Sequence, residues 1–233
     1  MKKGVRDMQF RLGELFCGPG GIAWGATHAD IGNPEFSIIH QWANDYDAST
    51  CETYRHNICP DTPQTVYHED IRKFDMTKLA PIDALAFGFP CNDYSVVGEQ
   101  KGMDGVYGPL YSYGVKALKL FKPQWFLAEN VGGLRNANEG KAFTKILAEL
   151  REAGYTITPH LYKFEEYGVP QARHRLIIVG IRNDIDVTYK VPSTEPYKDI
   201  DNTCRTAIEV PPIPANAFNH ERTKQSAIVV RLS

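Results

Sequence analysis

The chain has 233 residues, 42% of them hydrophobic and 23% charged, which is enough to form one large domain with a sizeable core. No apolar run approaches the length of a membrane span, and the first residues lack the apolar stretch of a signal peptide, so we expect no membrane partner. The formal net charge of −2 argues against an extended basic surface for nucleic acid, although it leaves room for a local basic cleft.

The five cysteines are an odd number without CxxC spacing, which argues against both a disulfide framework and a zinc site. The histidines form no ligand cluster with them in the sequence. We therefore expect reduced thiols, a cytoplasmic protein and no bound metal.

Apolar runs alternate with amphipathic segments along most of the chain. They predict strands at residues 11–17, 36–42, 83–87, 124–128, 156–162 and 175–181, and another strand that ends at 70–71. Helices are predicted at 22–30, 47–56 and 140–153, with Asp47 or Ser49 as the cap of the second. This alternation is typical of an α/β protein with a doubly wound, mostly parallel sheet, whose ligand binds at the carboxyl ends of the strands.

Prolines interrupt the pattern after residue 182. We predict one domain over residues 1–190 that carries both catalysis and cofactor binding. Residues 191–233 are predicted to be a loop-rich extension with one short helix near 223–230.

A glycine-rich loop, Phe16-Cys17-Gly18-Pro19-Gly20-Gly21, follows the first predicted strand, where glycines allow the backbone to approach a ligand. Asp45 and Tyr46 follow the second strand, and Asp70-Ile71 end the third. A tight turn, a helix cap and a turn carboxylate would each explain one of these features alone. Their positions at successive strand ends favour a nucleoside ligand.

Cys91 follows a predicted buried strand within Gly88-Phe89-Pro90-Cys91-Asn92-Asp93-Tyr94-Ser95. A cysteine on a loop at a strand end is a candidate nucleophile, whereas most free cysteines are small buried core residues. Polar residues follow Cys91, and residues 98–105 have the composition of a mobile lid.

Glu129 lies at the end of the next buried strand, in Ala128-Glu129-Asn130-Val131. A carboxyl group there is costly unless it is paired or used in chemistry. Arg173 and Arg175 open the last predicted strand and would share one face of an extended chain, as a site or as a surface ion pair.

These four stretches, in this order, resemble the DNA cytosine carbon-5 methyltransferases of bacterial restriction–modification systems. The resemblance runs from about Arg11 to Arg182 and includes the F-x-G-x-G-G loop, G-F-P-C, E-N-V and Q-x-R-x-R. It implies a Rossmann-like fold of the S-adenosylmethionine-dependent methyltransferases and double-stranded DNA as the substrate.

The resemblance also implies the cofactor contacts. S-adenosylmethionine, which leaves as S-adenosylhomocysteine, would lie over Phe16 and the loop formed by Gly18, Pro19, Gly20, Gly21 and Ile22. Asp45 would hold the ribose, Tyr46 and Leu110 would pack on the adenine, and Asp70 with Ile71 would bind the adenine edge.

For catalysis, the resemblance implies that a cytosine flips out of the duplex and that Cys91 attacks its carbon 6. Glu129 would contact nitrogen 3 and the amino group, Arg175 would bind oxygen 2, and Arg173 would orient the site. Asn92 departs from the glutamine that many relatives have after the cysteine, and we expect this change to be tolerated.

The chain also stops soon after a stretch that resembles the entry to the target-recognition region of the family, Asn219 to Gln225. We therefore expect that a second chain or segment supplies DNA recognition and closes the cofactor pocket. The alternatives are an inactive or partner-requiring fragment, a transfer-RNA cytosine methyltransferase of the same superfamily, and a nucleoside-binding regulatory module without chemistry.

Overall fold

The computed structural model describes residues 8–90 and 110–209. Cys91, the predicted lid at 98–105 and the predicted helix near 223–230 therefore lie outside the described residues. The chain divides into two compact units: Met1–Tyr162 with His174–Val191, and Lys163–Arg173 with Pro192–Ser233.

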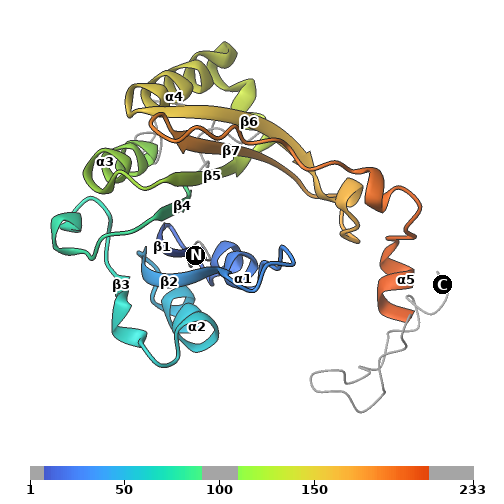
Figure 1. Ribbon diagram of the computed structural model, residues 1–233, viewed down its shortest axis with the longest axis horizontal. Helices are drawn as coiled ribbons and strands as arrows, with labels where there is room; N and C mark the ends of the chain where they lie inside the picture. The colour runs from blue at the N-terminus through green and yellow to red at the C-terminus, as the bar shows by residue number, and fades with distance from the viewer. Residues whose placement is uncertain (1–7, 91–109, 210–233) are drawn as a thin grey trace, which may run out of the picture. The chain divides into compact units, whose positions relative to one another are not determined.

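The strands of the described residues form one seven-stranded sheet in the order β3-β2-β1-β4-β5-β7-β6 (Figure 1). Their bounds are β1 (Met8–Leu15), β2 (Phe36–Asp45), β3 (Val66–His68), β4 (Ala84–Gly88), β5 (Trp125–Val131), β6 (Tyr155–Lys163) and β7 (His174–Arg182). The pairs from β3 through β5 are parallel, and β7 runs antiparallel to β5. The prediction of a doubly wound, mostly parallel sheet is confirmed.

Five α-helices accompany this sheet in the described part of the chain. They are α1 (Gly21–Thr27), α2 (Ala48–Ile58), α3 (Tyr111–Phe121), α4 (Lys141–Glu152) and α5 (Cys204–Glu209). Within residues 8–90 and 110–209, no helix is long and apolar enough to cross a membrane.

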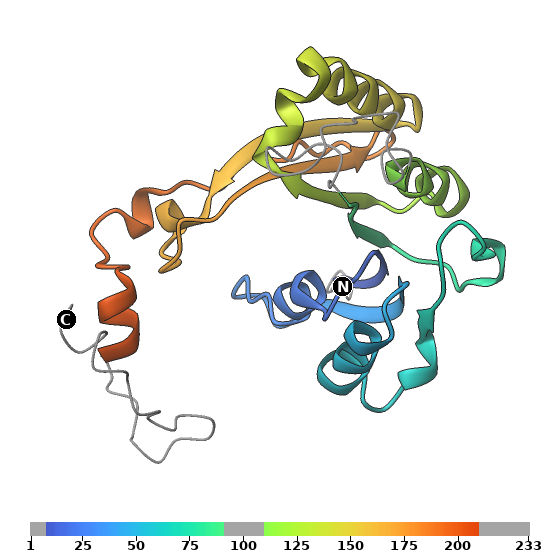
Figure 2. The same cartoon turned by 180° about the vertical axis from the view of Figure 1, so that it is seen from behind.

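Strand β4 shows how two helical layers cover the sheet, because its side chains alternate between the faces. Leu85 and Phe87 belong to the core cluster that includes side chains of α3 and α4. Ala84 and Ala86 belong to the cluster that includes side chains of α1 and α2. Figures 1 and 2 show these two helix pairs on opposite sides of the sheet.

Several predicted boundaries were wrong. Helix α1 ends at Thr27 rather than at residue 30, and the Thr27 hydroxyl bonds back to the Ala23 carbonyl at 2.9 Å. Strand β3 ends at His68, so Asp70 and Ile71 lie in the turn after it. Asp47 caps α2 through a 2.8 Å bond from the Thr50 amide, as predicted.

Helices α3 and α5 were not predicted. Helix α3 carries an apolar stripe of Tyr111, Val115 and Leu118, but Gly114 lowers its helix propensity. Gly114 is needed there because a Cβ at this position would lie 2.4 Å from the Phe87 ring on β4. Close helix–strand packing, rather than local preference, therefore explains this glycine.

Candidate active site

Three residues of the loop between β1 and α1 have left-handed backbone conformations. Phe16, Gly18 and Gly20 all have positive φ angles, of 56°, 52° and 96°. A positive φ is strained for a phenylalanine, and such strain is concentrated at functional sites. A Cβ on Gly20 would lie 2.8 Å from Ile58 of α2, so only glycine allows the loop to pack this closely.

Asp45, at the end of β2, ties this loop to the neighbouring strand. Its Oδ2 accepts a 2.8 Å bond from the Gly18 amide, and its Oδ1 accepts a 3.0 Å bond from the Asp47 amide. Asp45 is 9% exposed. The carboxylate therefore fixes the loop and does not cap α2, which is the role of Asp47.

The turn after β3 brings Asp70 next to Arg72. The Arg72 Nη2 lies 2.5 Å from Oδ2 of Asp70, and its Nε lies 2.9 Å from Oδ1. The Arg72 amide also donates to Oδ1 at 2.9 Å. These bonds from Arg72 hold the pKa of Asp70 at about 2, below its ordinary value.

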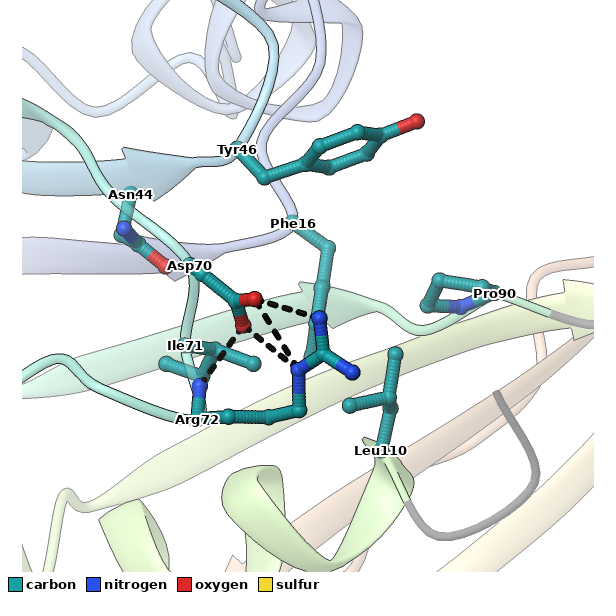
Figure 3. A pocket seen from close by; sticks show the side chains of 8 residues that line it. All are labelled: Phe16, Asn44, Tyr46, Asp70, Ile71, Arg72, Pro90 and Leu110. Carbon is teal, nitrogen blue, oxygen red and sulfur yellow. Dashed lines mark hydrogen bonds and ion pairs between the residues drawn. The ribbon is translucent and has the colours of Figure 1, made fainter. Parts of the chain in front are cut away.

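These strand ends enclose a pocket of about 100 Å³ (Figure 3). Complete small-molecule sites usually measure about 300–1,000 Å³, so this volume corresponds to part of a ligand, such as a base. The lining residues are Phe16, Asn44, Tyr46, Asp70, Ile71, Arg72, Pro90 and Leu110.

The lining thus brings together five of the predicted cofactor residues: Phe16, Tyr46, Asp70, Ile71 and Leu110. It does not include the loop residues Gly18, Pro19, Gly20, Gly21 and Ile22, nor Asp45, all of which lie at or beside the same loop.

Sequence reasoning missed Asn44, Arg72 and Pro90 as lining residues. Asn44 is 1% exposed, and its side-chain amide donates to the carbonyls of Tyr67 and Glu69 at 3.0 and 2.8 Å. A buried amide near a strand end is the signal that would have identified it, because such groups need fixed partners.

Glu129 and Arg175 form an ion pair on adjacent strands. Their Oε1 and Nε atoms are 2.8 Å apart, and their side chains are 27% and 22% exposed. On the other side, Glu129 pairs in register with Gly88 of β4, and a Cβ on Gly88 would lie 3.3 Å from the Glu129 Oε2. The predicted acid and arginine therefore meet directly beside the segment that leads to Cys91.

Asn130 fixes the backbone of that segment. Its Nδ2 donates to the Phe89 carbonyl at 3.1 Å, while its Oδ1 accepts from the Val131 amide at 2.8 Å. Asn130 is 3% exposed, so both bonds are shielded from water.

Arg173 belongs to the other compact unit and lies just before β7. Its amide donates to the Gln171 carbonyl at 2.8 Å, and its carbonyl accepts from the Phe164 amide at 3.0 Å. The structure therefore brings Glu129 together with Arg175 and assigns Arg173 to a separate unit.

Three of the four cysteines of the described residues fit the role of small core side chains better than that of nucleophiles. Cys17, Cys51 and Cys59 are buried, and burial raises the pKa of each thiol. Cys204 is exposed and donates to the Pro170 carbonyl at 3.0 Å. Within residues 8–90 and 110–209, no group of three potential metal ligands comes together.

Two buried side chains, Glu14 and Tyr54, and the half-buried His40 form a chain of polar contacts. Glu14 is 1% exposed and accepts a 3.1 Å bond from the Tyr54 hydroxyl, which lies 3.2 Å from Nδ1 of His40. Burial raises the pKa of Glu14 to about 8 and lowers that of His40 to about 4. Both groups are therefore held in their neutral forms near pH 7.

Comparisons of the sequence with a family model and with known proteins agree on one family. Residues 10–230 match the C-5 cytosine-specific DNA methylases. The chain is 56% identical to the type II methyltransferase M.BbvI of Brevibacillus brevis, over 97% of this chain and 62% of that protein. It is 34% identical to the type II methyltransferase M.NgoFVII of Neisseria gonorrhoeae, over 91% of this chain and 55% of that protein.

Solved structures show the same fold. A putative DNA modification methyltransferase from a prophage of E. coli superposes with a TM-score of 0.60 at 23% identity, over 77% of this chain and 49% of that one. The Dnmt2 methyltransferase of S. pombe superposes with a TM-score of 0.58 at 18% identity, over 82% and 56% of the two chains. The sheet is thus that of a Rossmann-like methyltransferase.

Proposed function

Because the chain belongs to the family of C-5 cytosine-specific DNA methylases, we propose that it transfers a methyl group from S-adenosylmethionine to carbon 5 of a cytosine in double-stranded DNA. The observation that carries this proposal is the 2.8 Å pair of Glu129 and Arg175 beside the segment that leads to Cys91. The similarity to type II methyltransferases supports a role in a restriction–modification system.

The pocket fits the nucleoside part of the proposed cofactor. Apolar side chains of Phe16, Ile71 and Leu110 line it, and the Asp70 carboxylate offers an acceptor to a base amino group. The exposed Tyr46 ring would pack on the base, while Asp45 and the loop of Gly18, Pro19, Gly20, Gly21 and Ile22 would hold the ribose and the rest of the cofactor. When bound, S-adenosylmethionine supplies an electrophilic methyl group and leaves as S-adenosylhomocysteine.

The nucleophile in this proposal is Cys91, which lies outside the described residues. Its thiolate would add to carbon 6 of a flipped-out cytosine, and the electrons of the ring double bond would move toward carbon 5. Carbon 5 would then take the methyl group. A water molecule would take up the carbon-5 proton, the electrons of that bond would restore the double bond, and the Cys91 thiolate would leave.

Glu129 and Arg175 would bind the polar edge of the ring, and the Arg175 guanidinium would stabilise the negative charge that develops on it. Glu129 would contact nitrogen 3 and the amino group, Arg175 would bind oxygen 2, and Arg173 would orient the site. Because the two side chains already contact each other, their charges are arranged before the base enters, which is the preorganisation that electrostatic catalysis requires. The Asn130 bond to the Phe89 carbonyl fixes the backbone two residues before Cys91.

The chain spans 62% of the length of M.BbvI and 55% of that of M.NgoFVII. We therefore also propose that DNA recognition, and the closure of the cofactor pocket, depend on a region such as the relatives possess beyond this match, in further sequence or in a second chain.

Covalent capture tests the nucleophile. The chain is incubated with S-adenosylmethionine and duplex DNA that contains 5-fluorocytosine, whose carbon 5 has no proton to lose, so the Cys91 adduct should persist. Mass spectrometry of the digest should place the DNA on Cys91, and Cys91→Ser should form no adduct. Cys204→Ser is the matched control because Cys204 is the exposed cysteine of the described residues. An adduct that persists in Cys91→Ser would contradict the proposal, as would an adduct that mass spectrometry places on another residue.

A further inference from the structure

The turn that carries Asp70 and Arg72 is anchored on both sides. The Glu69 amide donates to the Asp45 carbonyl at 3.0 Å, and the buried Asn44 amide holds the Glu69 carbonyl. After Asp70, the Lys73 amide donates to the Asp70 carbonyl at 2.8 Å. The backbone below both side chains is therefore fixed by strand β2 and by the turn itself.

The Arg72 side chain engages both carboxylate oxygens of Asp70. Nε lies 2.9 Å from Oδ1 and 3.0 Å from Oδ2, and Nη2 lies 2.5 Å from Oδ2. Together with the backbone bond to Oδ1, these contacts use most of the roughly four lone-pair positions of a carboxylate. The carboxylate is thus held in one orientation by three N–H groups, which leaves about one of its roughly four lone-pair positions for a ligand donor.

Both side chains also line the pocket, together with Phe16 and Leu110 (Figure 3). The Asp70 side chain is 29% exposed and the Arg72 side chain 57% exposed, so the pair is accessible to a ligand. A fixed carboxylate presents an acceptor to the pocket. The Arg72 guanidinium donates to that carboxylate through Nε and Nη2.

We propose that Arg72 is a positioning residue that sets the base specificity of the pocket by orienting Asp70 toward a purine amino group. This inference rests on the proposed function and deepens it. An oriented carboxylate accepts a hydrogen bond from the amino group of adenine and repels the carbonyl oxygen that hypoxanthine has at the same position. Without Arg72, the Asp70 side chain regains rotational freedom and this discrimination weakens.

The test compares two ligands that differ at that position, S-adenosylhomocysteine and S-inosylhomocysteine, by calorimetric titration of the full chain. The measured quantity is the ratio of the two dissociation constants. We expect wild type to favour the adenosyl ligand and Arg72→Ala to reduce the ratio about tenfold, the effect of one hydrogen bond to a charged group. Arg72→Lys, which keeps the charge without the two-pronged geometry, should recover part of the ratio.

Two controls test whether Arg72 acts through Asp70. Lys73→Ala removes an exposed cation from the next position, outside the pocket lining, and should leave the ratio unchanged. Asp70→Ala should abolish the discrimination, and Arg72→Ala added to Asp70→Ala should have no further effect on the ratio, because Arg72 acts through Asp70.

The outcomes separate this inference from the proposed function. If folded wild type binds neither ligand, both fall. If wild type binds and Arg72→Ala weakens both ligands equally, or leaves the ratio unchanged, the positioning role of Arg72 is overturned while the cofactor site stands.

Discussion

At the residue scale, the Glu129–Arg175 pair is both a structural ion pair and the proposed centre of catalysis. The sequence alone left these two interpretations open. The structure adds the position of the pair: Glu129 pairs in register with Gly88 on the neighbouring strand, and neither Glu129 nor Arg175 lines the pocket at the strand ends. This separation allows effects on catalysis and on cofactor binding to be measured independently.

Glu129→Gln keeps the shape of the side chain but removes its charge. We expect the kcat of methyl transfer to DNA to fall about 100-fold or more, the typical loss when a preorganised polar group is removed. The dissociation constant of S-adenosylhomocysteine should change less than about twofold, since Glu129 does not line the pocket. Glu152→Gln, at an exposed position of α4, is the control. A Glu129→Gln variant with nearly normal kcat would remove Glu129 from the mechanism.

The contributions of Glu14 and His40 to the free energy of unfolding change in opposite directions with pH. The folded-state pKa of Glu14, about 8, is above its ordinary 4.5, so the folded protein keeps a proton that the unfolded chain loses between these values. The free energy of unfolding therefore falls as pH rises through this window. The folded-state pKa of His40, about 4, is below its ordinary 6.5, so its contribution rises with pH between 4 and 6.5. Above pH 6.5, the Glu14 contribution is left unopposed by His40.

Glu14→Gln retains a hydrogen-bonding partner for Tyr54 but cannot titrate. We expect wild type to lose up to about 2 kcal/mol of unfolding free energy between pH 6.5 and 8, and Glu14→Gln to lose much less. Urea unfolding at both pH values measures the difference. The side chain of Glu52 is 75% exposed, so Glu52→Gln serves as the control and should behave as wild type. Equal slopes in wild type and Glu14→Gln would show that Glu14 is ionised in the folded protein.

At the element scale, the sequence predicted those strands and helices whose apolar pattern is continuous. The strands at 36–42 and 175–181 correspond to β2 and β7, and the helix at 140–153 corresponds to α4. Helix α3 was missed because Gly114 interrupts its pattern for a reason that lies in the partner strand. The end of β3 was misplaced because Asp70 belongs to a turn whose hydrogen bonds come from Arg72 and Lys73.

Two glycine-to-alanine changes test the packing of α3 against the sheet. At Gly114 the added methyl group would meet Phe87 at 2.4 Å, whereas at Gly25 of α1 it would meet nothing within 4 Å. Both changes improve helix propensity by up to about 1 kcal/mol. Gly114→Ala should nevertheless destabilise the fold by about 1–3 kcal/mol through overpacking, while Gly25→Ala should be neutral or stabilising. Thermal unfolding of the two variants measures this difference in stability. Equal melting temperatures for Gly114→Ala and Gly25→Ala would contradict overpacking at Gly114.

At the scale of the whole molecule, the sequence predicted the fold class but not the membership of the two units. The segment Lys163–Arg173 belongs with Pro192–Ser233. There the Tyr167 hydroxyl donates to the Pro192 carbonyl at 3.1 Å, and the Tyr167 and Tyr197 rings lie 6.1 Å apart. These contacts join residues more than twenty positions apart, which local patterns do not reveal. The division into a catalytic and cofactor-binding domain over residues 1–190 and a loop-rich extension over residues 191–233 stays a prediction.

The candidate site shows the same limit. Residues at strand ends, such as Phe16 and Asp70, were predicted because a loop after each parallel strand points to one edge of the sheet. Arg72 was missed because its role depends on the side-chain geometry of a turn. The class of ligand could therefore be predicted from the order of the motifs. The full set of residues that line the pocket could be identified only from the structure.

The most direct test of the account is a calorimetric titration of S-adenosylmethionine into the chain and into a Phe16→Ala, Asp45→Ala double variant. Leu120→Ala, an exposed position of α3 outside the pocket lining, is the matched control. We predict saturable one-to-one binding to wild type and to Leu120→Ala, and its loss in the double variant, which should remain folded by circular dichroism. Binding that survives in the double variant, or folded wild type that takes up no cofactor, would contradict the assignment of this pocket.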